Sequence, residues 1–235
     1  MHLSSTLAKA ALLVCAAASP LEERQSCPAI HIFGARETTA PAGYGTAGVF
    51  VNLILNAYPG STAEAISYPA TGDSQYGASV RAGTQNIANQ INSFNSRCPD
   101  SKLVVVGYSQ ADEFRQQGAQ IGDNALCGGG DPNQGITDTK VLVSSSAASA
   151  IKAVIWGGNP RNSPAEKSFH VGSCTAQGFD PRPQGFSCPA FQSKLQSYCD
   201  APDPYCCTGN NAATHQAYGQ VYGQQALQFV KSKLG

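Results

Sequence analysis

The segment Leu103–Val106 consists of four large aliphatic residues, three of which are β-branched valines. Such a run is typical of a central strand that is covered on both faces. Further strand candidates lie at 30–33, 63–68 and 153–156, and segments with helical character lie at 47–57, 78–94 and 218–234. Alternating strands and helices predict an α/β fold with a mostly parallel sheet, in which reactive groups collect at the carboxyl ends of the strands.

The length of the chain and its net charge indicate one globular domain that does not bind nucleic acid or an anionic membrane surface. The 235 residues fit one globular domain, and no linker, internal repeat or low-complexity tract follows residue 25. Charged residues make up 13% of the chain and the formal net charge is zero. Nucleic acids and anionic membrane surfaces select a basic excess, so neither is expected as a partner. A neutral or apolar substrate fits this composition better.

The N-terminus has the features of a targeting segment. Lys9 precedes the apolar run Ala10–Ala18, and the spacer Ser19–Arg24 follows. The run is too short to span a bilayer, so the pattern favours a cleaved secretory signal over a frayed N-terminal helix. We therefore expect a signal peptide at 1–18, a short propeptide or spacer at 19–24, one catalytic domain at 25–235, and an extracellular protein.

Cysteine use agrees with export. Cys15 lies in the expected signal, and eight further cysteines follow it. An even number in an exported chain indicates disulfides, whereas a metal site is disfavoured because Cys-x-x-Cys and clustered histidines are absent from the sequence. The adjacent residues Cys206 and Cys207 cannot easily pair with each other, so they are expected to tie one loop to two places.

Ser109 follows the central strand directly, in the motif Gly107-Tyr108-Ser109-Gln110. A sharp turn from strand to helix would project its hydroxyl from the sheet edge and aim the first helix amides at a reacting carbonyl. The pattern G-x-S-x-G is incomplete, however, because Ala111 stands where the second glycine belongs. Ser109 is thus either a nucleophile or a cap of the next helix.

A catalytic triad in such a fold would place the acid and the histidine after the serine. His2 lies in the expected signal and His31 precedes the serine, which leaves two candidates. His170 would need Glu166, four residues away in one short loop, and is the weaker of the two. His215 lies in a polar loop before the last helix, where the alternative is a surface histidine at a helix start.

Asp203 is the favoured acid for His215. It lies twelve positions upstream, and the cysteines at 199, 206 and 207 bracket it. Cross-links would hold its loop stiffly, as suits a carboxylate that fixes the tautomer and orientation of an imidazole. Asp200 is the competing acid.

Several long motifs resemble the fungal acetylxylan esterases of the cutinase-like serine esterase family: SCPAIHIFGARETTAPAGYGTAG, GYSQ, NALCGGGDPNQG, GFDPRPQGFSCP and YCDAPDPYCCTGNNAATHQAYGQ. The resemblance covers nearly the whole mature chain. It implies a compact three-layer α/β/α hydrolase fold with a central, mostly parallel five-stranded sheet and no lid. It also implies a monomeric serine esterase without metal or organic cofactor.

The resemblance assigns roles to particular positions. It implies Ser109 as nucleophile, Asp203 as acid and His215 as base, with an oxyanion hole formed by the main-chain N–H groups of Thr38 and Gln110. Two such donors suit a developing oxyanion. The implied disulfides are Cys27–Cys98, Cys127–Cys188, Cys174–Cys207 and Cys199–Cys206.

Within the family, two classes of substrate compete. Cutinases tend to carry Ala-Arg-Gly followed by Ser or Thr after the first strand, whereas this chain has Ala35-Arg36-Glu37-Thr38. The sequence therefore favours acetylated xylan, or another plant-wall ester, as the substrate. A cutinase or general short-chain carboxylesterase is the alternative.

The chain departs from the family beside the nucleophile. Ala111–Gln117 (ADEFRQQ) separates Gln110 from Gly118, and deleting these seven residues restores the family pattern. Seven residues are about two helical turns, so an insertion here nearly preserves the buried face of the later helix. It would put Asp112 and Glu113 in the first helical turn, where their charge opposes an oxyanion. The segment is either a gene-model error or a real insertion, and the latter favours an inactive, disulfide-rich wall-binding homologue.

Overall fold

The computed structural model describes residues 26–109, 117–164 and 167–235. The expected signal and spacer, together with residues 110–116 of the interrupted motif, lie outside the described residues. The described part contains one sheet with strand order β2-β1-β3-β4-β6-β5, in which all paired strands are parallel. The strands are β1 (Ile30–Ala35), β2 (Thr62–Ala65), β3 (Lys102–Tyr108), β4 (Ile151–Gly157), β5 (His170–Val171) and β6 (Leu195–Tyr198).

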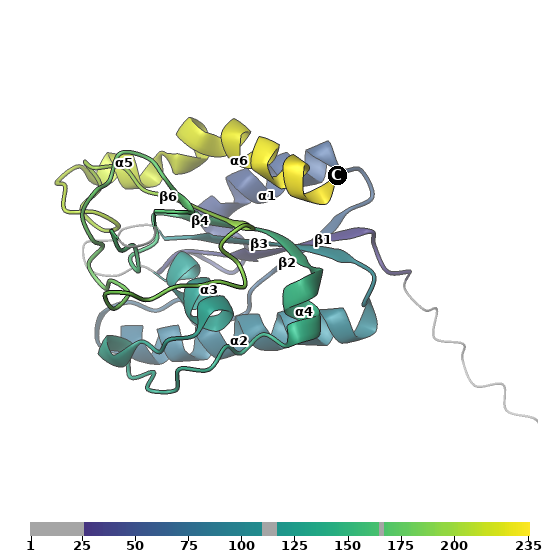
Figure 1. Cartoon of the computed structure of the whole chain (residues 1–235), viewed down its shortest axis with the longest axis horizontal. Helices are drawn as coiled ribbons and strands as arrows, with labels where there is room; N and C mark the ends of the chain where they lie inside the picture. The colour runs from purple at the N-terminus through teal and green to yellow at the C-terminus, as the bar shows by residue number, and fades with distance from the viewer. Residues whose placement is uncertain (1–25, 110–116, 165–166) are drawn as a thin grey trace, which may run out of the picture.

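Helices cover both faces of this sheet (Figure 1). α1 (Gly48–Ala57) and α6 (Tyr218–Leu234) lie on one face, and α2 (Tyr76–Arg97), α3 (Gly118–Cys127) and α4 (Ser145–Ala150) lie on the other. The short α5 (Ala212–Gln216) precedes α6, and three 3₁₀ turns complete the described elements: η1 (Gly45–Ala47), η2 (Asp73–Gln75) and η3 (Pro132–Gln134). The predicted three-layer α/β/α fold is confirmed. None of the helices described here is long and apolar enough to cross a membrane.

The predicted number of strands was wrong, because the sheet has six strands and not five. The additional strand, β5, has two residues and pairs with β6 at the sheet edge, where His170 is opposite Ser197. Two residues are too few to show an alternating pattern, so this strand cannot be recognised from hydrophobic periodicity. The strand expected at 63–68 is also shorter, spanning Thr62–Ala65.

The central strand β3 separates two apolar cores. Leu103 and Val105 pack into the core beneath α2, α3 and α4, whereas Val104 and Val106 pack into the core beneath α1 and α6. All four side chains are fully buried, and burying one such side chain contributes about 1.5–3 kcal/mol. The prediction that this strand is covered on both faces is confirmed.

Four disulfides link the loops around the sheet. The pairs are those that the family resemblance implies: Cys27–Cys98, Cys127–Cys188, Cys174–Cys207 and Cys199–Cys206. The first closes a loop with a sequence separation of 71 residues, and the last closes one of 7. Cys206 and Cys207 thus tie one loop to two different segments.

Candidate active site

The candidate residues Ser109 and His215 both lie against the end of β4. The N–H of Ser109 donates a 2.9 Å hydrogen bond to the carbonyl of Gly157. The imidazole of His215 covers Gly158, where an added Cβ would lie 2.2 Å from the His215 Cε1 atom. The main chain of Ser109 and the imidazole of His215 thus contact consecutive residues at the carboxyl edge of the sheet, where reactive groups are expected in this class of fold.

A buried hydrogen bond joins the predicted acid to the predicted base. Nδ1 of His215 lies 2.6 Å from Oδ2 of Asp203, and both side chains have no solvent exposure. Oδ2 also accepts a 2.6 Å hydrogen bond from the Tyr218 hydroxyl, while Oδ1 accepts from the N–H groups of Tyr205 at 2.7 Å and Cys206 at 3.1 Å. The Asp203 carboxylate is therefore held on both oxygens.

These contacts decide the ionisation of Asp203. Burial opposes its charge, but the hydrogen bond and the charge of His215, the Tyr218 hydroxyl and the Tyr205 N–H together outweigh burial. The pKa of the Asp203 carboxyl consequently lies below its usual value. An ionised carboxylate on Nδ1 favours the tautomer whose proton is on Nδ1 and whose Nε2 can accept a proton.

The loop around Asp203 is fixed by its own covalent and hydrogen bonds. The disulfide Cys199–Cys206 closes it, and the N–H of Gly209, three residues after the closed loop, donates to the Asp203 carbonyl at 2.9 Å. The competing acid, Asp200, contacts other groups: its carboxylate accepts from the N–H and hydroxyl of Ser173 and from the Tyr222 hydroxyl, each at 2.9 Å. Asp203 is therefore the carboxylate that the structure places on His215.

The other histidines lie elsewhere. Nδ1 of His31 is 2.6 Å from the Thr62 hydroxyl, and its ring stacks on Phe94 with centroids 3.9 Å apart. Burial, with a smaller effect of Arg97, lowers the pKa of His31 to about 4. His170 lies in β5, and burial lowers its pKa as well. Its proposed partner Glu166 lies outside the described residues.

Ser109 and His215 have no hydrogen bond to each other. Oγ of Ser109 and Nε2 of His215 are both buried, and neither has a hydrogen-bond partner among the described residues. Tyr108 links the two indirectly, because its hydroxyl donates to the His215 carbonyl at 2.8 Å and accepts from the Tyr218 N–H at 3.0 Å. The sequence analysis missed this role of Tyr108, although the residue is part of the GYSQ motif.

The turn expected after Ser109 falls on residues 110–112, which lie outside the described residues. The N–H of Ser109 itself continues the β3–β4 pairing.

α3 begins at Gly118, directly against the ends of β1 and β3. An added Cβ at Gly118 would lie 2.2 Å from the Tyr108 carbonyl oxygen and 2.5 Å from those of Ala35 and Arg36. Such distances exclude a side chain at this position. Asp112 and Glu113, which were expected in the first turn of the helix, lie outside the described residues, and the first turn of α3 contains no acidic residue. The glycine sets the start of the helix.

Thr38 lies in a segment that is held from both sides. The Arg36 guanidinium donates to the carbonyls of Ile66 and Tyr68, and the Glu37 carboxylate accepts from the N–H of Thr46 at 2.8 Å. Thr38 is itself buried, and its hydroxyl has no hydrogen-bond partner among the described residues. The second predicted oxyanion residue, Gln110, lies outside the described residues.

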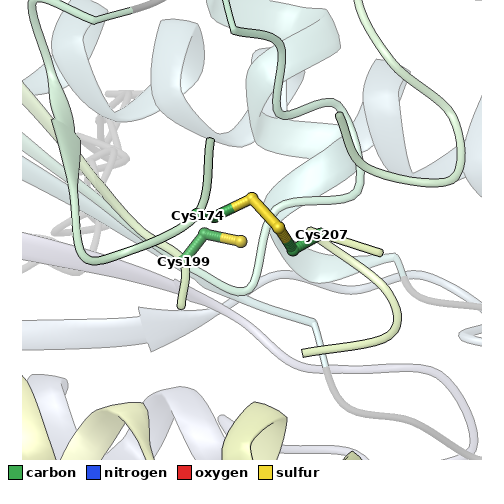
Figure 2. A group of neighbouring side chains, drawn as sticks. All are labelled: Cys174, Cys199 and Cys207. Carbon is green, nitrogen blue, oxygen red and sulfur yellow. A yellow bond between two sulfur atoms is a disulfide. The ribbon is translucent and has the colours of Figure 1, made fainter. Parts of the chain in front are cut away.

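Two groups of side chains are close enough together to hold a metal ion. The sulfur atoms of Cys174, Cys199 and Cys207 lie within 4.8 Å of one another, and so do the ligand atoms of Cys199, Asp203 and Cys206. Figure 2 shows the sulfur of Cys174 joined to that of Cys207, with Cys199 beside them. Because all four sulfurs belong to disulfides, they are not thiolates and cannot act as the usual cysteine ligands. The close approach reflects two neighbouring disulfides.

The chain is similar to known esterases over its full length. The cutinase family model matches residues 26–234. Cutinase 11 of Verticillium dahliae is 59% identical over 240 residues, covering 100% of this chain and 78% of the relative. Acetylxylan esterase 2 of Talaromyces purpureogenus is 57% identical over 244 residues, covering 100% of both. A solved acetylxylan esterase structure matches with a TM-score of 0.84 and 58% identity, covering 89% of this chain and 100% of the other. The chain belongs to the cutinase family.

Proposed function

We propose that this protein is a secreted serine esterase that hydrolyses O-acetyl esters of xylan. The observation that carries the proposal is the buried 2.6 Å hydrogen bond between Asp203 and His215, next to the strand end that bears Ser109. A buried imidazole with one nitrogen on a carboxylate and the other unpaired is the arrangement a general base requires. The similarity to acetylxylan esterases supports the class of substrate.

The reaction follows from these positions. Nε2 of His215 takes the proton of the Ser109 hydroxyl while Oγ attacks the acetyl carbonyl carbon. The carbonyl π electrons move to oxygen, and the oxyanion is stabilised by main-chain N–H groups that include that of Thr38. The C–O bond to the sugar then breaks, and the sugar oxygen takes the proton from His215. Water, activated by the same histidine, attacks the acyl-enzyme, and acetate leaves as Ser109 recovers its proton.

Asp203 orients the imidazole and stabilises its positive charge. With its pKa below the usual range, the carboxylate remains ionised throughout the reaction. The hydrogen bond between the Ser109 hydroxyl and Nε2 of His215 has to form when substrate binds, because neither atom has a partner among the described residues. Burial of both atoms raises the strength of that bond once it forms.

Hydrolysis of cutin or other longer acyl esters is the second candidate. It is favoured by the 59% identity to a cutinase. The two substrate classes are separated by comparing kcat/KM on 4-nitrophenyl esters of acetate, butyrate and palmitate, and on acetylated xylan. A preference for acetate together with release of acetate from xylan supports our proposal, whereas a preference for palmitate supports a cutinase.

Activity itself is tested with Ser109→Ala. We expect a burst of 4-nitrophenol from the native protein, covalent labelling of Ser109 by a phosphonate, and loss of both in the variant. Ser232→Ala is the matched control, because this serine is exposed on α6 and its hydroxyl donates only to the Phe229 carbonyl. Binding of xylan without any effect of Ser109→Ala on a measured rate would instead identify an inactive wall-binding homologue.

The intact mass of the protein from the culture medium tests three further expectations. A mass that begins near residue 25 and includes 111–117 supports secretion, cleavage after residue 24 and a real insertion. A mass that is lower by the seven residues identifies a gene-model error in the sequence.

A further inference from the structure

We propose that the second oxyanion donor is the main-chain N–H of Gln117, eight positions after the nucleophile, and not that of Gln110. This inference rests on the proposed function. It concerns the last residue of the interruption 111–117, whereas the family resemblance implies Gln110 as the donor. Gln117 is the residue immediately before α3, and it is fully buried.

The contacts of Gly118 place the start of α3 beside both the nucleophile and Thr38. Its Cα faces the carbonyl oxygen of Tyr108, the residue before Ser109, and the carbonyl oxygen of Arg36, two residues before Thr38. Gly107 confirms this close packing, because an added Cβ there would lie 2.6 Å from the Gly118 carbonyl oxygen. Gln117 precedes Gly118 and therefore belongs to the same junction.

The N-terminal end of a helix supplies suitable donors. The first N–H groups of a helix have no intrahelical acceptor, and the helix dipole places partial positive charge there. α3 has ten residues, and the N–H of Ile121 bonds to the Gln117 carbonyl at 2.8 Å, so Gln117 starts the hydrogen-bonded ladder. An oxyanion at this end is favoured for the same reason that phosphates are.

Unpaired polar atoms mark the same place independently. The hydroxyls of Ser109 and Thr38 are at least nine-tenths buried, and neither has a hydrogen-bond partner among the residues that the structure describes. Buried hydroxyls are normally paired, and these two belong to segments whose Tyr108 and Arg36 carbonyls contact the start of α3. Two unpaired hydroxyls on these segments indicate a site that a polar ligand completes.

The side chain of Gln117 fixes the position of its main chain. Its Oε1 accepts from the Ser79 hydroxyl at 2.7 Å, and its Nε2 donates to the Thr71 carbonyl at 2.5 Å. The N–H of Thr71 in turn donates to the Ser79 hydroxyl at 3.1 Å. This set of three residues, the Gln117 clamp, joins the start of α3 to α2 and to the loop after β2.

The same loop holds Thr38. The N–H of Thr39 donates to the Ala70 carbonyl at 2.7 Å, and an added Cβ at Gly72 would lie 3.5 Å from the Thr38 methyl group. The loop at 70–72 thus contacts both proposed donor residues. It holds Thr38 through the hydrogen bond of Thr39, and it holds Gln117 through the amide side chain of that residue. A neutral glutamine does this without adding a charge that would oppose the oxyanion.

The sequence permits the assignment. Removing 110–116 from the chain joins Ser109 to Gln117-Gly118 and gives the same sequence as removing 111–117. Gln117 can therefore take the place of the glutamine that the family carries before its glycine. The chain has two candidates for that place, and the described structure anchors the second one.

The direct test replaces a single main-chain N–H by oxygen. An α-hydroxy acid incorporated at position 117 removes the donor but keeps the side chain, and the same replacement at position 110 is the comparison. We expect kcat on 4-nitrophenyl acetate to fall about 10²–10³-fold at 117 with little change in KM, the loss typical of one oxyanion donor. A loss that follows position 110 and spares position 117 overturns the proposal.

The side-chain clamp is tested with Gln117→Ala. It should lower kcat and the rate of phosphonate labelling of Ser109 with little change in KM, since it displaces a donor used only in the transition state. Gln85→Ala is the matched control, because this glutamine is exposed on α2 and bonds only to Asn89. Equal kcat in native protein and Gln117→Ala would exclude the clamp as a positioning device.

A crystal structure of the native protein with a phosphonate on Ser109 tests the proposal without any variant, so a failure to fold cannot affect the result. The proposal requires the Gln117 nitrogen, and not that of Gln110, to lie within hydrogen-bond distance of the phosphonyl oxygen. An adduct bound by Gln110 refutes this proposal and leaves the esterase intact. A native protein that neither hydrolyses esters nor reacts with the phosphonate refutes the proposed function and this inference together.

Discussion

Two disulfides make a matched pair for separating the stability of the fold from the rigidity of the site. Cys27–Cys98 closes a loop with a separation of 71 residues and lies at the far end of the sheet, whereas Cys199–Cys206 closes one of 7 around Asp203. Each is removed by two cysteine-to-alanine substitutions. Removal of Cys27–Cys98 should cost more stability, because the larger loop restricts the unfolded chain more. Removal of Cys199–Cys206 should cost more activity, because this disulfide closes the loop around Asp203.

The stability losses can be worked from the loop lengths and burial. For these separations, the chain-entropy relation gives about 4.4 kcal/mol for Cys27–Cys98 and about 2.4 kcal/mol for Cys199–Cys206. Cys199 and Cys206 are fully buried, Cys98 is mostly buried and Cys27 is exposed. Counting each buried sulfur as about 0.8 kcal/mol of apolar burial raises the expected losses to about 5 and about 4 kcal/mol.

The activity losses should run the other way. Cys206 donates its N–H to the Asp203 carboxylate at 3.1 Å, and its sulfur lies 3.4 Å from the Tyr218 hydroxyl, which is also bound to that carboxylate. Opening the loop frees the carboxylate that orients His215, and a displacement of about 1 Å in such a group costs up to about 10²-fold in rate. We expect kcat to fall about tenfold to a hundredfold without Cys199–Cys206 and to stay within about threefold without Cys27–Cys98.

Urea unfolding followed by circular dichroism measures the free energies of unfolding, and kcat is measured on 4-nitrophenyl acetate at a temperature at which both variants are folded. The reasoning fails if the variant without Cys199–Cys206 keeps its kcat, because hydrogen bonds alone would then hold Asp203. It also fails if kcat falls in proportion to the loss of stability in both variants, since the effect would then come from partial unfolding.

Three further predictions concern single residues. Tyr218→Phe removes a 2.6 Å hydrogen bond to the Asp203 carboxylate, so the pKa of Asp203 should rise. The loss of about 1 kcal/mol should lower kcat on 4-nitrophenyl acetate about threefold to tenfold. An unchanged pH–rate profile would contradict this. Burial lowers the pKa of His31 in the folded protein to about 4, whereas a histidine in an unfolded chain has a pKa of about 6.5. The unfolded state therefore binds the proton first, and stability should decrease as pH falls from about 6.5 to about 4, by up to about 3 kcal/mol. Urea unfolding of His31→Gln should show a flatter dependence over that window, and an equally steep one would exclude His31 as the cause. Gly118→Ala should abolish activity and destabilise the fold because its Cβ would meet three carbonyl oxygens. Gly48→Ala, at the first residue of α1, should be tolerated in both assays because its Cβ would lie 3.5 Å from the Tyr44 Cβ.

Local patterns in the sequence predict the elements that bury apolar side chains. The valines of β3 identify a strand covered on both faces, and the spacing of apolar residues identifies α2 and α6. The pairing of Asp203 with His215 was predictable because the cysteines restrict the loop and the order of the triad is fixed. β5 was not predictable, since a two-residue strand exists only through its hydrogen bonds to β6 and the disulfide of Cys174 nearby.

Buried polar networks were also beyond the sequence, because their partners come from distant loops. Arg161 lies 3.1 Å from Asp131 and 3.5 Å from Asp180, and Arg182 lies 3.1 Å from Asp123. Gln120 of α3 donates to both Asp131 and Asp180 at 2.8 and 2.7 Å. The motifs GGGDPNQG and GFDPRPQGF contain Asp131, Asp180 and Arg182, but neither motif alone shows that the charges compensate each other. This network holds the helix that starts at the candidate site.

The start of α3 after the interruption can be found from steric packing but not from the periodicity of the sequence. Counting helical turns predicts that seven extra residues lengthen α3 and keep its buried face, with Ala111 beside the nucleophile. The carbonyl oxygens of Ala35, Arg36 and Tyr108 leave no space for a Cβ at the start of α3, so a register with Ala111 there is excluded and the helix begins at Gly118. A shift of two turns hardly changes which helix face is buried, so helix periodicity does not distinguish the two registers. The three carbonyl oxygens within 2.5 Å of a Cβ at position 118 do distinguish them, because only glycine fits there. The glycine therefore sets the register, and the proposed second donor beside Thr38 is Gln117, the residue that precedes this glycine.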